Sequence, residues 1–191
     1  MPESRILVFA GSIRTGAYSG KLAAAAAKEL AVAGADVTFV SLGDYPLPIY
    51  NADMEKHDGF PENARKFARL IEAHQGIFIA TPEYNHSLPP LLKNTIDWTS
   101  RPKLAAEIKV RGKVFAIGSS SDGLIGGARA LLDLRKVLNT AYSAITIPEQ
   151  ISMSKSGEAY DEHGNFVAEA PQKLMATIAR RLIEVAGRLA P

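Results

Sequence analysis

The sequence predicts an α/β fold, a three-layer sandwich in which helices cover both faces of a five-stranded parallel sheet with strand order 2-1-3-4-5. Two observations lead to this prediction. Short apolar runs alternate with longer segments of helical periodicity, and the alternation repeats five times. The chain has 191 residues, of which 47% are apolar, so it is the usual size of one compact domain. We therefore expect residues 1–191 to form a single domain.

Each predicted strand is a nearly continuous apolar run, as expected of parallel strands that are buried on both faces. The five runs are residues 5–10, 36–41, 76–81, 113–118 and 143–148. Right-handed connections between such strands produce a doubly wound sheet, for which 2-1-3-4-5 is a common strand order.

Helical spacing of apolar residues fills the segments between and after the strands. The predicted helices are residues 19–33, 61–73, 90–100, 126–139 and 171–190. Ser19 is a possible N-cap, and Pro61, Pro90 and Pro171 stand where a missing N–H costs little. Gly34 is expected to end the first helix. The single tryptophan, Trp98, is expected at a core edge or in a subunit contact.

Two connections are longer than usual, residues 42–60 and 149–165. We expect both to be irregular, because neither shows a strong periodic pattern. Loops of this length are often functional, and a surface insertion without a role is an equally weighted alternative.

Composition excludes several functions. The net charge is only +2, with 22 Lys and Arg mixed among 20 Asp and Glu, so no basic stripe for nucleic acid is expected. The chain has no cysteine, which rules out disulfides, thiolate metal sites and cysteine nucleophiles, so any redox chemistry must depend on a bound cofactor. The four histidines lack metal-ligand spacing, and no metal is expected. No signal peptide or membrane span is recognised, which predicts a cytoplasmic protein.

In a sheet of this kind ligands bind at the carboxyl ends of the strands, which nominates the loops 11–18, 82–89 and 119–126. The first loop runs from a strand into a helix N-terminus, where free N–H groups favour a phosphate. Ser12, Thr15 and Ser19 add hydroxyls and Arg14 adds a charge. The loop lacks the P-loop lysine and the G-x-G-x-x-G dinucleotide pattern. A simple tight turn is the alternative.

The second loop, T-P-E-Y-N-H-S-L-P-P, combines stiff prolines with an aromatic residue, which suits a rigid wall against a flat ring. A proline-braced surface turn is the alternative. The third loop, S-S-S-D-G-L-I-G-G, offers amides and hydroxyls for the polar edge of a heterocycle, or else a flexible connection. It lacks G-x-S-x-G, so a hydrolase has little support.

Three stretches together resemble the NADPH-dependent FMN reductase family, which includes quinone, chromate and azo-dye reductases. They are G-S-I-R, T-P-E-Y-N-H-S-L-P-P-L-L-K-N-T-I-D-W, in which P-E-Y-N is the specific part, and G-G-A-R-A-L-L-D-L-R. The resemblance implies a flavodoxin-like fold, noncovalent FMN, NADPH or NADH as the reductant, and a homodimer or homotetramer.

The resemblance also implies roles for individual residues. Ser12, Arg14 and Ser19 would hold the FMN phosphate, and Pro82, Glu83, Tyr84 and Asn85 would line the isoalloxazine. The stretch 119–123, with Ser119, Ser120 and Gly123, would approach its other side. The chain departs from the family pattern at Ala17 and Ser19, where many members have Ser and Asn, and at Pro90, where glycine is common.

The function that follows is an NAD(P)H-dependent oxidoreductase that reduces quinones, free flavin, azo compounds or chromate by ping-pong hydride transfer. The chemistry resides on the flavin, so no catalytic side chain is expected, and Glu83 is expected to orient its loop or to meet another subunit. A flavodoxin-like electron carrier that serves a protein partner is the alternative, although carriers tend to be acidic and the sequence pI here is about 8.8. A flavin-dependent sensor without turnover is a third possibility.

Overall fold

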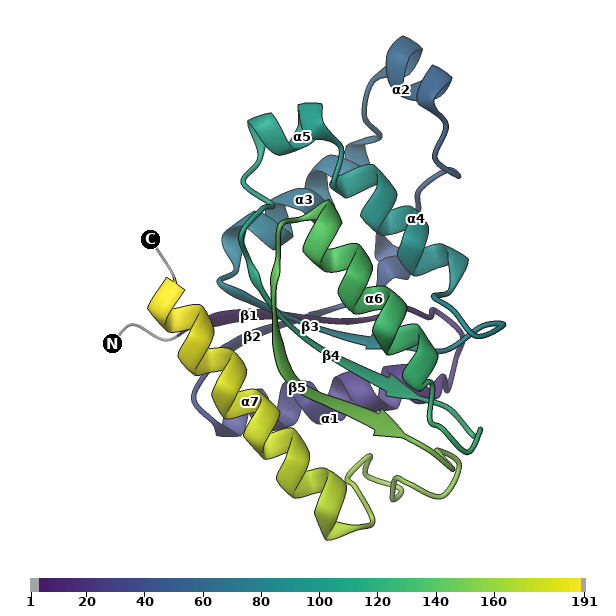
Figure 1. Ribbon diagram of the computed structural model, residues 1–191, viewed down its shortest axis with the longest axis vertical. Coiled ribbons are helices and arrows are strands. Elements are labelled where there is room, and N and C mark those ends of the chain that lie inside the picture. The colour runs from purple at the N-terminus through teal and green to yellow at the C-terminus, as the bar shows by residue number, and fades with distance from the viewer. Residues whose placement is uncertain (1–3, 190–191) are drawn as a thin grey trace.

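A computed structural model describes residues 4–189 and contains the expected parallel sheet (Figure 1). The strands are β1 (Arg5–Ala10), β2 (Asp36–Val40), β3 (Gly76–Thr81), β4 (Val114–Ser120) and β5 (Ile145–Met153). Their order is β2-β1-β3-β4-β5 and all neighbours are parallel, which confirms the predicted topology. The two central strands β3 and β4 are buried along their whole length, which explains their continuous apolar sequence.

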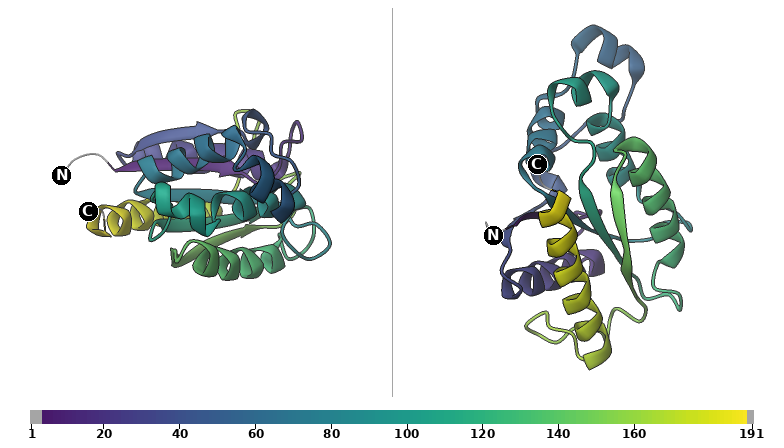
Figure 2. Two further views of the ribbon diagram at one scale, coloured as in Figure 1. Left: turned by 90° about the horizontal axis from the view of Figure 1, so that it is seen from above. Right: turned by 60° about the vertical axis from the view of Figure 1, so that its left-hand side comes forward.

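Helices cover the sheet on both faces (Figure 2). On one face lie α1 (Tyr18–Val32) and α7 (Glu169–Leu189), and on the other lie α3 (Glu62–Ala73), α4 (Pro90–Thr99) and α6 (Ala128–Ala141). Each face has its own hydrophobic cluster, and the buried apolar side chains of β1, β3 and β4 contribute to both clusters. The predicted end of the last helix at residue 190 lies outside the described residues.

Proline and glycine mark the helix ends largely as predicted. Pro90 is the first residue of α4, Pro61 precedes the first residue of α3, and Pro171 lies in the first turn of α7. Gly34 follows α1 with a φ of 87°, a left-handed conformation that favours glycine. These residues set the helix ends from local chemistry alone.

The segment 42–60 is not irregular, which corrects the prediction. It contains a short 3₁₀ helix (Leu42–Asp44) and α2 (Ala52–Asp58), and a further short helix, α5 (Pro102–Glu107), follows α4 (Figure 1). The Asn51 side chain accepts a hydrogen bond from the Asp53 N–H at 2.7 Å, and Gly59 ends α2 with a φ of 78°. Both capping signals are in the sequence, but α2 is only two turns long and has no buried residue, so it has little apolar periodicity.

The same segment buries Trp98, which is fully inaccessible. Its indole N–H donates to the Pro48 carbonyl at 2.7 Å, and its ring packs edge-on against Tyr50 at a centroid distance of 5.0 Å. Trp98 therefore packs at the edge of the core, as one of the two predictions stated. The other prediction, a subunit contact, is wrong, because the chain covers this residue itself.

Strand β5 continues five residues past Pro148, into the stretch that was expected to be irregular. A register shift against β4 between Phe115 and Ile117 accommodates the proline, which has no N–H for the ladder. The Arg135 guanidinium on α6 donates to the carbonyls of Thr146 and Ile147 at 3.0 and 2.9 Å. Arg135 thus satisfies carbonyl groups beside the shift, and the strand resumes.

Candidate functional site

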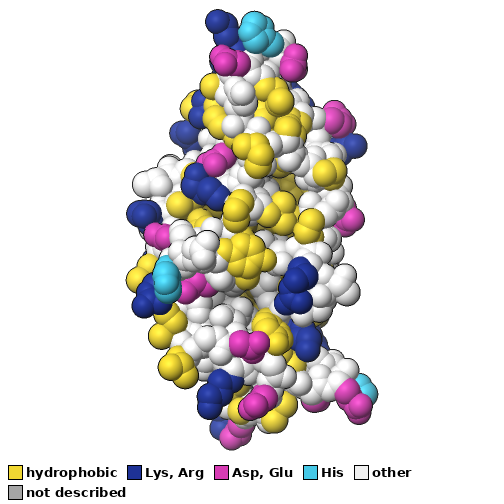
Figure 3. Space-filling model, turned by 90° about the vertical axis from the view of Figure 1, so that its right-hand side faces the viewer, with side chains coloured by type: hydrophobic (Ala, Val, Ile, Leu, Met, Phe, Trp, Pro, Cys, Tyr) yellow, Lys and Arg dark blue, Asp and Glu magenta, His cyan; other side chains and the backbone are white. Residues whose placement is uncertain are grey.

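The loops after β1, β3 and β4 come together at one edge of the sheet and enclose a pocket of about 200 Å³. Figure 3 views the side of the molecule toward which these strands run, where apolar side chains gather in the middle and charges of both signs surround them. We call this the switch-point pocket. Its lining residues are Ser12, Arg14, Ala17, Tyr18, Ser19, Pro82, Glu83, Tyr84, Ser120, Ser121 and Asp122.

The first turn of α1 forms one end of the pocket. The helix begins at Tyr18, and among the described residues no side chain caps its first N–H groups. Ser19 is therefore not the N-cap, which corrects the prediction; Ala17 occupies that position. Ser19 lies inside the first turn, and its buried hydroxyl has no hydrogen-bond partner among residues 4–189. A buried hydroxyl beside uncapped N–H groups is an incomplete arrangement that an anion would complete.

The loop before α1 is held in a tight turn. Gly11 donates its N–H to the Ala80 carbonyl at 2.8 Å, which extends the pairing of β1 with β3, and Gly16 has a φ of 70°. The Arg14 side chain is exposed and donates to the neighbouring Thr15 carbonyl at 3.3 Å. No acidic side chain in the described part of the chain forms an ion pair with Arg14. Its charge is therefore available to a ligand at the pocket mouth.

The loop after β3 ends in a two-residue hairpin turn. Tyr84 and Ser87 exchange two backbone hydrogen bonds of 3.1 Å, and Asn85 and His86 between them have φ values of 48° and 65°. Left-handed φ at two successive residues is the geometry of a type I′ turn. The turn is strained for residues other than glycine, so contacts elsewhere must hold it.

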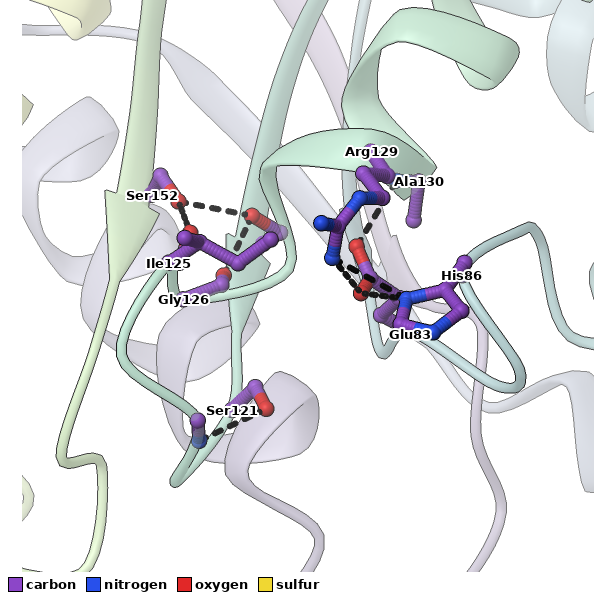
Figure 4. Close-up of polar contacts among 10 residues, drawn as sticks. Glu83, His86, Ser121, Ile125, Gly126, Arg129, Ala130 and Ser152 are labelled. Atoms are coloured by element: carbon purple, nitrogen blue, oxygen red, sulfur yellow. Dashed lines mark hydrogen bonds and ion pairs between the residues drawn. The ribbon is translucent and has the colours of Figure 1, made fainter.

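Two side chains of this loop clamp it to α6, and Figure 4 shows the first of these contacts, from Glu83. The Glu83 carboxylate, 11% exposed, accepts the N–H of Ala130 in the first turn of α6 at 3.1 Å. Ser87 donates its hydroxyl to the Asp133 carboxylate at 2.6 Å. The hydrogen bond from Ser87 is the largest cause that lowers the pKa of Asp133, and the hydrogen bond from Lys136 is the next. The loop is thus a fixed wall, and the favourable interaction of a carboxylate with a helix N-terminus contributes to holding it.

Glu83 and its neighbours form a small charged cluster at the base of this wall. Its second carboxylate oxygen lies 3.7 Å from His86 Nδ1 and 4.0 Å from the Arg129 guanidinium, and Arg129 Nη1 lies 3.0 Å from His86 Nδ1 (Figure 4). Because an arginine can only donate, His86 Nδ1 is the acceptor of this hydrogen bond. The carboxylate is committed to α6, which agrees with the expectation that Glu83 orients its loop.

Serine hydroxyls bind backbone carbonyls of the loop after β4 and hold this loop in place. Ser119 is fully buried and donates to the Gly126 carbonyl at 2.7 Å. Ser152 on β5 donates to the Ile125 carbonyl at 2.7 Å (Figure 4). Gly126 and Gly127 have φ values of 59° and 84°, and a Cβ on Gly126 would lie 2.6 Å from a backbone carbon of β5. Glycine is therefore required where this loop passes β5.

The front of the same loop faces the switch-point pocket through Ser120, Ser121 and Asp122. The Asp122 carboxylate accepts the Gly157 N–H at 2.8 Å and fixes the loop to the segment after β5. A hydrogen bond to Asp122 is the largest cause that raises the pKa of Tyr18 above its usual value.

A shallower apolar hollow of about 300 Å³ adjoins the switch-point pocket and shares Ser12, Arg14 and Tyr84 with it. Leu91 and the exposed Ile13 form its apolar part. A flat, uncharged molecule could therefore approach the pocket mouth from this side. Within residues 4–189 no cluster of His, Asp and Glu could hold a metal ion, and no helix is long and apolar enough to cross a membrane.

Comparison with known proteins decides between the uses of such a site. The profile of the family described as NADPH-dependent FMN reductase matches residues 4–158. The chain belongs to this family. It is 39% identical over 175 residues to a 2-hydroxy-1,4-benzoquinone reductase of Burkholderia, and the match covers 91% of each chain. It is also 38% identical over 135 residues to a quinone reductase of Escherichia coli K12, and that match covers 70% of this chain and 69% of the relative.

Among solved structures, the flavoenzyme NAD(P)H:(acceptor) oxidoreductase FerB of Paracoccus denitrificans superposes with a TM-score of 0.82 at 27% identity, covering 97% of this chain and 98% of that one. The flavodoxin-like fold is thereby confirmed. As a member of the FMN reductase family, the protein is an NAD(P)H-dependent flavin oxidoreductase with FMN as its cofactor.

The switch-point pocket fits FMN. Its inner end has what a phosphate monoester needs: an unpartnered buried hydroxyl at Ser19, uncapped N–H groups at the start of α1, and the charge of Arg14 near the mouth. Its wall at residues 82–84 is rigid, as a flat ring requires. Ala17 removes one hydroxyl relative to the family pattern, but the N–H groups and Ser19 remain.

The structure brings most of the predicted site residues to this pocket. Six of them line it directly, namely Ser12, Arg14, Ser19, Pro82, Glu83 and Tyr84, and Ser120 lines it from the opposite side. Three do not line it. Asn85 is exposed in the hairpin turn, the Ser119 hydroxyl points to the Gly126 carbonyl, and the Gly123 N–H donates to Ser121 Oγ at 3.1 Å.

Ala17 and Tyr18 line the pocket without having been predicted to bind the cofactor, whereas Ser121 and Asp122 fall within the predicted stretch 119–123. All four lie inside the loops 11–18 and 119–126 that the sequence nominated. Their positions at the ends of strands were the available signal, but which side chains of a loop face a pocket depends on the loop conformation.

Proposed function

We propose that this protein is an FMN-containing reductase that uses NAD(P)H to reduce small acceptors in a ping-pong sequence, with quinones as the preferred class. One observation carries the proposal: the phosphate end, the rigid loop 82–89 and the apolar hollow all share one opening, through Ser12, Arg14 and Tyr84. The two relatives named quinone reductases support this choice of acceptor over azo compounds, chromate or free flavin.

In this proposal the residues divide into two ends of one site. Ser12, Arg14 and Ser19 bind the FMN phosphate, and the α1 N–H groups complete its coordination. Pro82, Glu83 and Tyr84 place the wall beside the isoalloxazine, with Asn85 acting through the turn conformation. The opposite side is formed by Ser120 and Ser121, while Ser119 and Gly123 set the course of the loop.

Bound FMN supplies the redox chemistry, accepting a hydride from NAD(P)H and passing two electrons to the acceptor. The protein orients both substrates and keeps one opening for them. Because NAD(P)H and the acceptor use the same opening, they exclude each other, and one must leave before the other binds. No side chain of the pocket needs to transfer a proton in the first half-reaction.

Anaerobic stopped-flow measurements with the holoenzyme test this proposal. NAD(P)H should bleach the flavin absorbance without acceptor, and a quinone should then restore it without NAD(P)H. Double-reciprocal plots of turnover should be parallel. Intersecting plots would contradict the shared opening. Bleaching that is restored only by a partner protein would favour the electron carrier instead.

We also propose a single domain, a homodimer or homotetramer, and a cytoplasmic location, where NAD(P)H is available. The assembly is supported by the exposed apolar side chains Leu124, Ile125 and Leu132 on and beside α6, next to the flavin site. Light scattering should give a multiple of the 20.5 kDa chain mass, and a monomer at micromolar concentration would contradict the assembly.

A further inference from the structure

A second pocket, of about 420 Å³, lies at the other edge of the sheet, where β1, β3 and β4 begin. β3 has six residues, so this edge is about 20 Å from the switch-point pocket. We call it the basic pocket. The charged side chains that line it are Arg5, Glu72, Lys109, Arg111 and Lys113.

The basic pocket contains four cationic side chains and one carboxylate, although the whole chain is nearly neutral. Within residues 4–189 the four cations form no ion pair with an acidic side chain, whereas cations at many other positions do. The carboxylate of Glu72 does not balance them by contact, because its Oε1 accepts the backbone N–H of Lys109 at 3.0 Å. Positive charge therefore predominates among the described residues that line the pocket.

Lys113 is the most restrained of these cations. It is half-buried, and its ammonium group donates to the backbone carbonyl of Glu72 at 2.6 Å. Burial lowers the pKa of Lys113, because a partly desolvated ammonium is unfavourable, and the nearby Glu72 carboxylate only partly opposes this shift. Arg111 and Gly112 lie in the turn before it, which the hydrogen bond from the Gly112 N–H to the Tyr142 carbonyl fixes at 3.0 Å. Hydrogen bonds thus fix the turn that holds Arg111 and Lys113.

The remaining wall of the basic pocket is apolar. Val114 and Ala186 are buried at its base, and Leu189 on the last turn of α7 is half exposed beside it. A pocket of this volume is within the range for small organic ligands, which bury apolar surface as well as polar groups. Its occupant should therefore carry several negative charges and an organic part.

We propose that the basic pocket binds an organic polyphosphate, such as a nucleoside di- or triphosphate, at a site separate from the flavin site. Arginine forks and lysine ammonium groups are the side chains that recognise phosphate oxygens, and several of them together exceed what one carboxylate can neutralise. The nucleoside part would cover Val114, Ala186 and Leu189. This inference does not depend on the nature of the electron acceptor.

Calorimetric titration of the FMN-saturated protein with ATP and with pyrophosphate tests the proposal, because FMN then occupies the phosphate end of the switch-point pocket. ATP should bind, and should bind more weakly at high salt. The double variant K109Q/R111Q removes two exposed cations of the basic pocket and should weaken ATP binding at least about tenfold. The control K56Q/K103Q removes two exposed cations elsewhere and should change it by less than about twofold. The flavin spectrum checks that both variants are folded.

Four outcomes would overturn the proposal. The first is that ATP fails to bind at low salt. The second is that the two double variants weaken ATP binding equally, which would indicate general charge attraction. The third is that pyrophosphate binds as tightly as ATP, which would show that the organic part of the ligand contributes nothing to binding. The fourth is that ATP competes with NAD(P)H and binds K109Q/R111Q as well as the wild type, which would place it at the flavin site instead.

Discussion

The substitution Ser19→Ala should move two properties of this protein in opposite directions. The Ser19 hydroxyl is buried without a partner in the cofactor-free chain, and an unsatisfied buried hydroxyl costs about 1–3 kcal/mol. Alanine removes that cost and is also the better helix former. We expect the apoprotein to gain about 1–2 kcal/mol, which for a chain of this size raises its melting temperature by about 2–8 °C.

The same substitution should weaken FMN binding. A hydrogen bond from a hydroxyl to a charged phosphate contributes about 1.5–3 kcal/mol, so the dissociation constant should rise about 10- to 100-fold. Riboflavin, which lacks the phosphate, should bind almost as before. Flavin fluorescence quenching measures both affinities, and calorimetry of the apoprotein measures its stability.

Ser12→Ala is the matched control, because the Ser12 hydroxyl already accepts the Arg14 N–H at 3.3 Å and is not buried. It should weaken FMN binding without stabilising the apoprotein. The reasoning is refuted if Ser19→Ala leaves the apoprotein no more stable than the wild type. Equal losses for FMN and riboflavin would show that Ser19 acts by packing and does not contact the phosphate.

Three further predictions follow from the contacts of single side chains. Arg14→Ala should weaken FMN binding about tenfold or more and should change riboflavin binding little. Arg14→Lys should recover part of the lost FMN affinity, and high salt should narrow the difference in FMN affinity between Arg14→Ala and the wild type. Equal effects on both flavins in fluorescence titrations would contradict this. Glu83→Gln weakens the carboxylate contact with the first turn of α6, so it should lower the free energy of unfolding by about 1 kcal/mol. It should also alter the visible circular dichroism of bound FMN. An unchanged spectrum would show that the Glu83 contact does not position the wall at residues 82–84. Burial lowers the pKa of His74 below 6.5. The neutral ring therefore stabilises the fold fully above pH 6.5, and this stabilisation is lost as the pH falls from 6.5 through the pKa of His74 in the folded protein. Urea titrations should show that His74→Gln flattens this pH dependence and that His57→Gln, on exposed α2, does not; the same slope in all three proteins would refute the assignment.

Much of the fold follows from local patterns in the sequence. Continuous apolar runs identify β1 to β5, and the parallel direction of these strands places loops 11–18, 82–89 and 119–126 at one edge. The uncapped N–H groups at the start of α1 were predictable for the same reason, since a strand that leads into a helix exposes N–H groups whatever the rest of the chain does.

Other features depend on contacts between residues far apart in the chain. Strand β5 should have ended at Pro148 on local grounds, and it continues because a register shift and Arg135 from α6 compensate for the missing ladder contacts. The prediction that Trp98 could serve a subunit contact failed because residues 42–60 fold back over it. Neither outcome is a property of the local sequence.

The sequence by itself determined the strands and the loops that form the switch-point pocket, because hydrophobic periodicity and strand direction depend on neighbouring residues. The strand order was inferred from the usual topology of such sheets. Only the tertiary structure decided which atoms of those loops face the pocket. The unpartnered hydroxyl of Ser19, the contact of Glu83 with Ala130 and the cations around the basic pocket each result from packing between elements. Burial and hydrogen-bond partners exist only once distant segments pack together, and they determine the chemistry of a side chain.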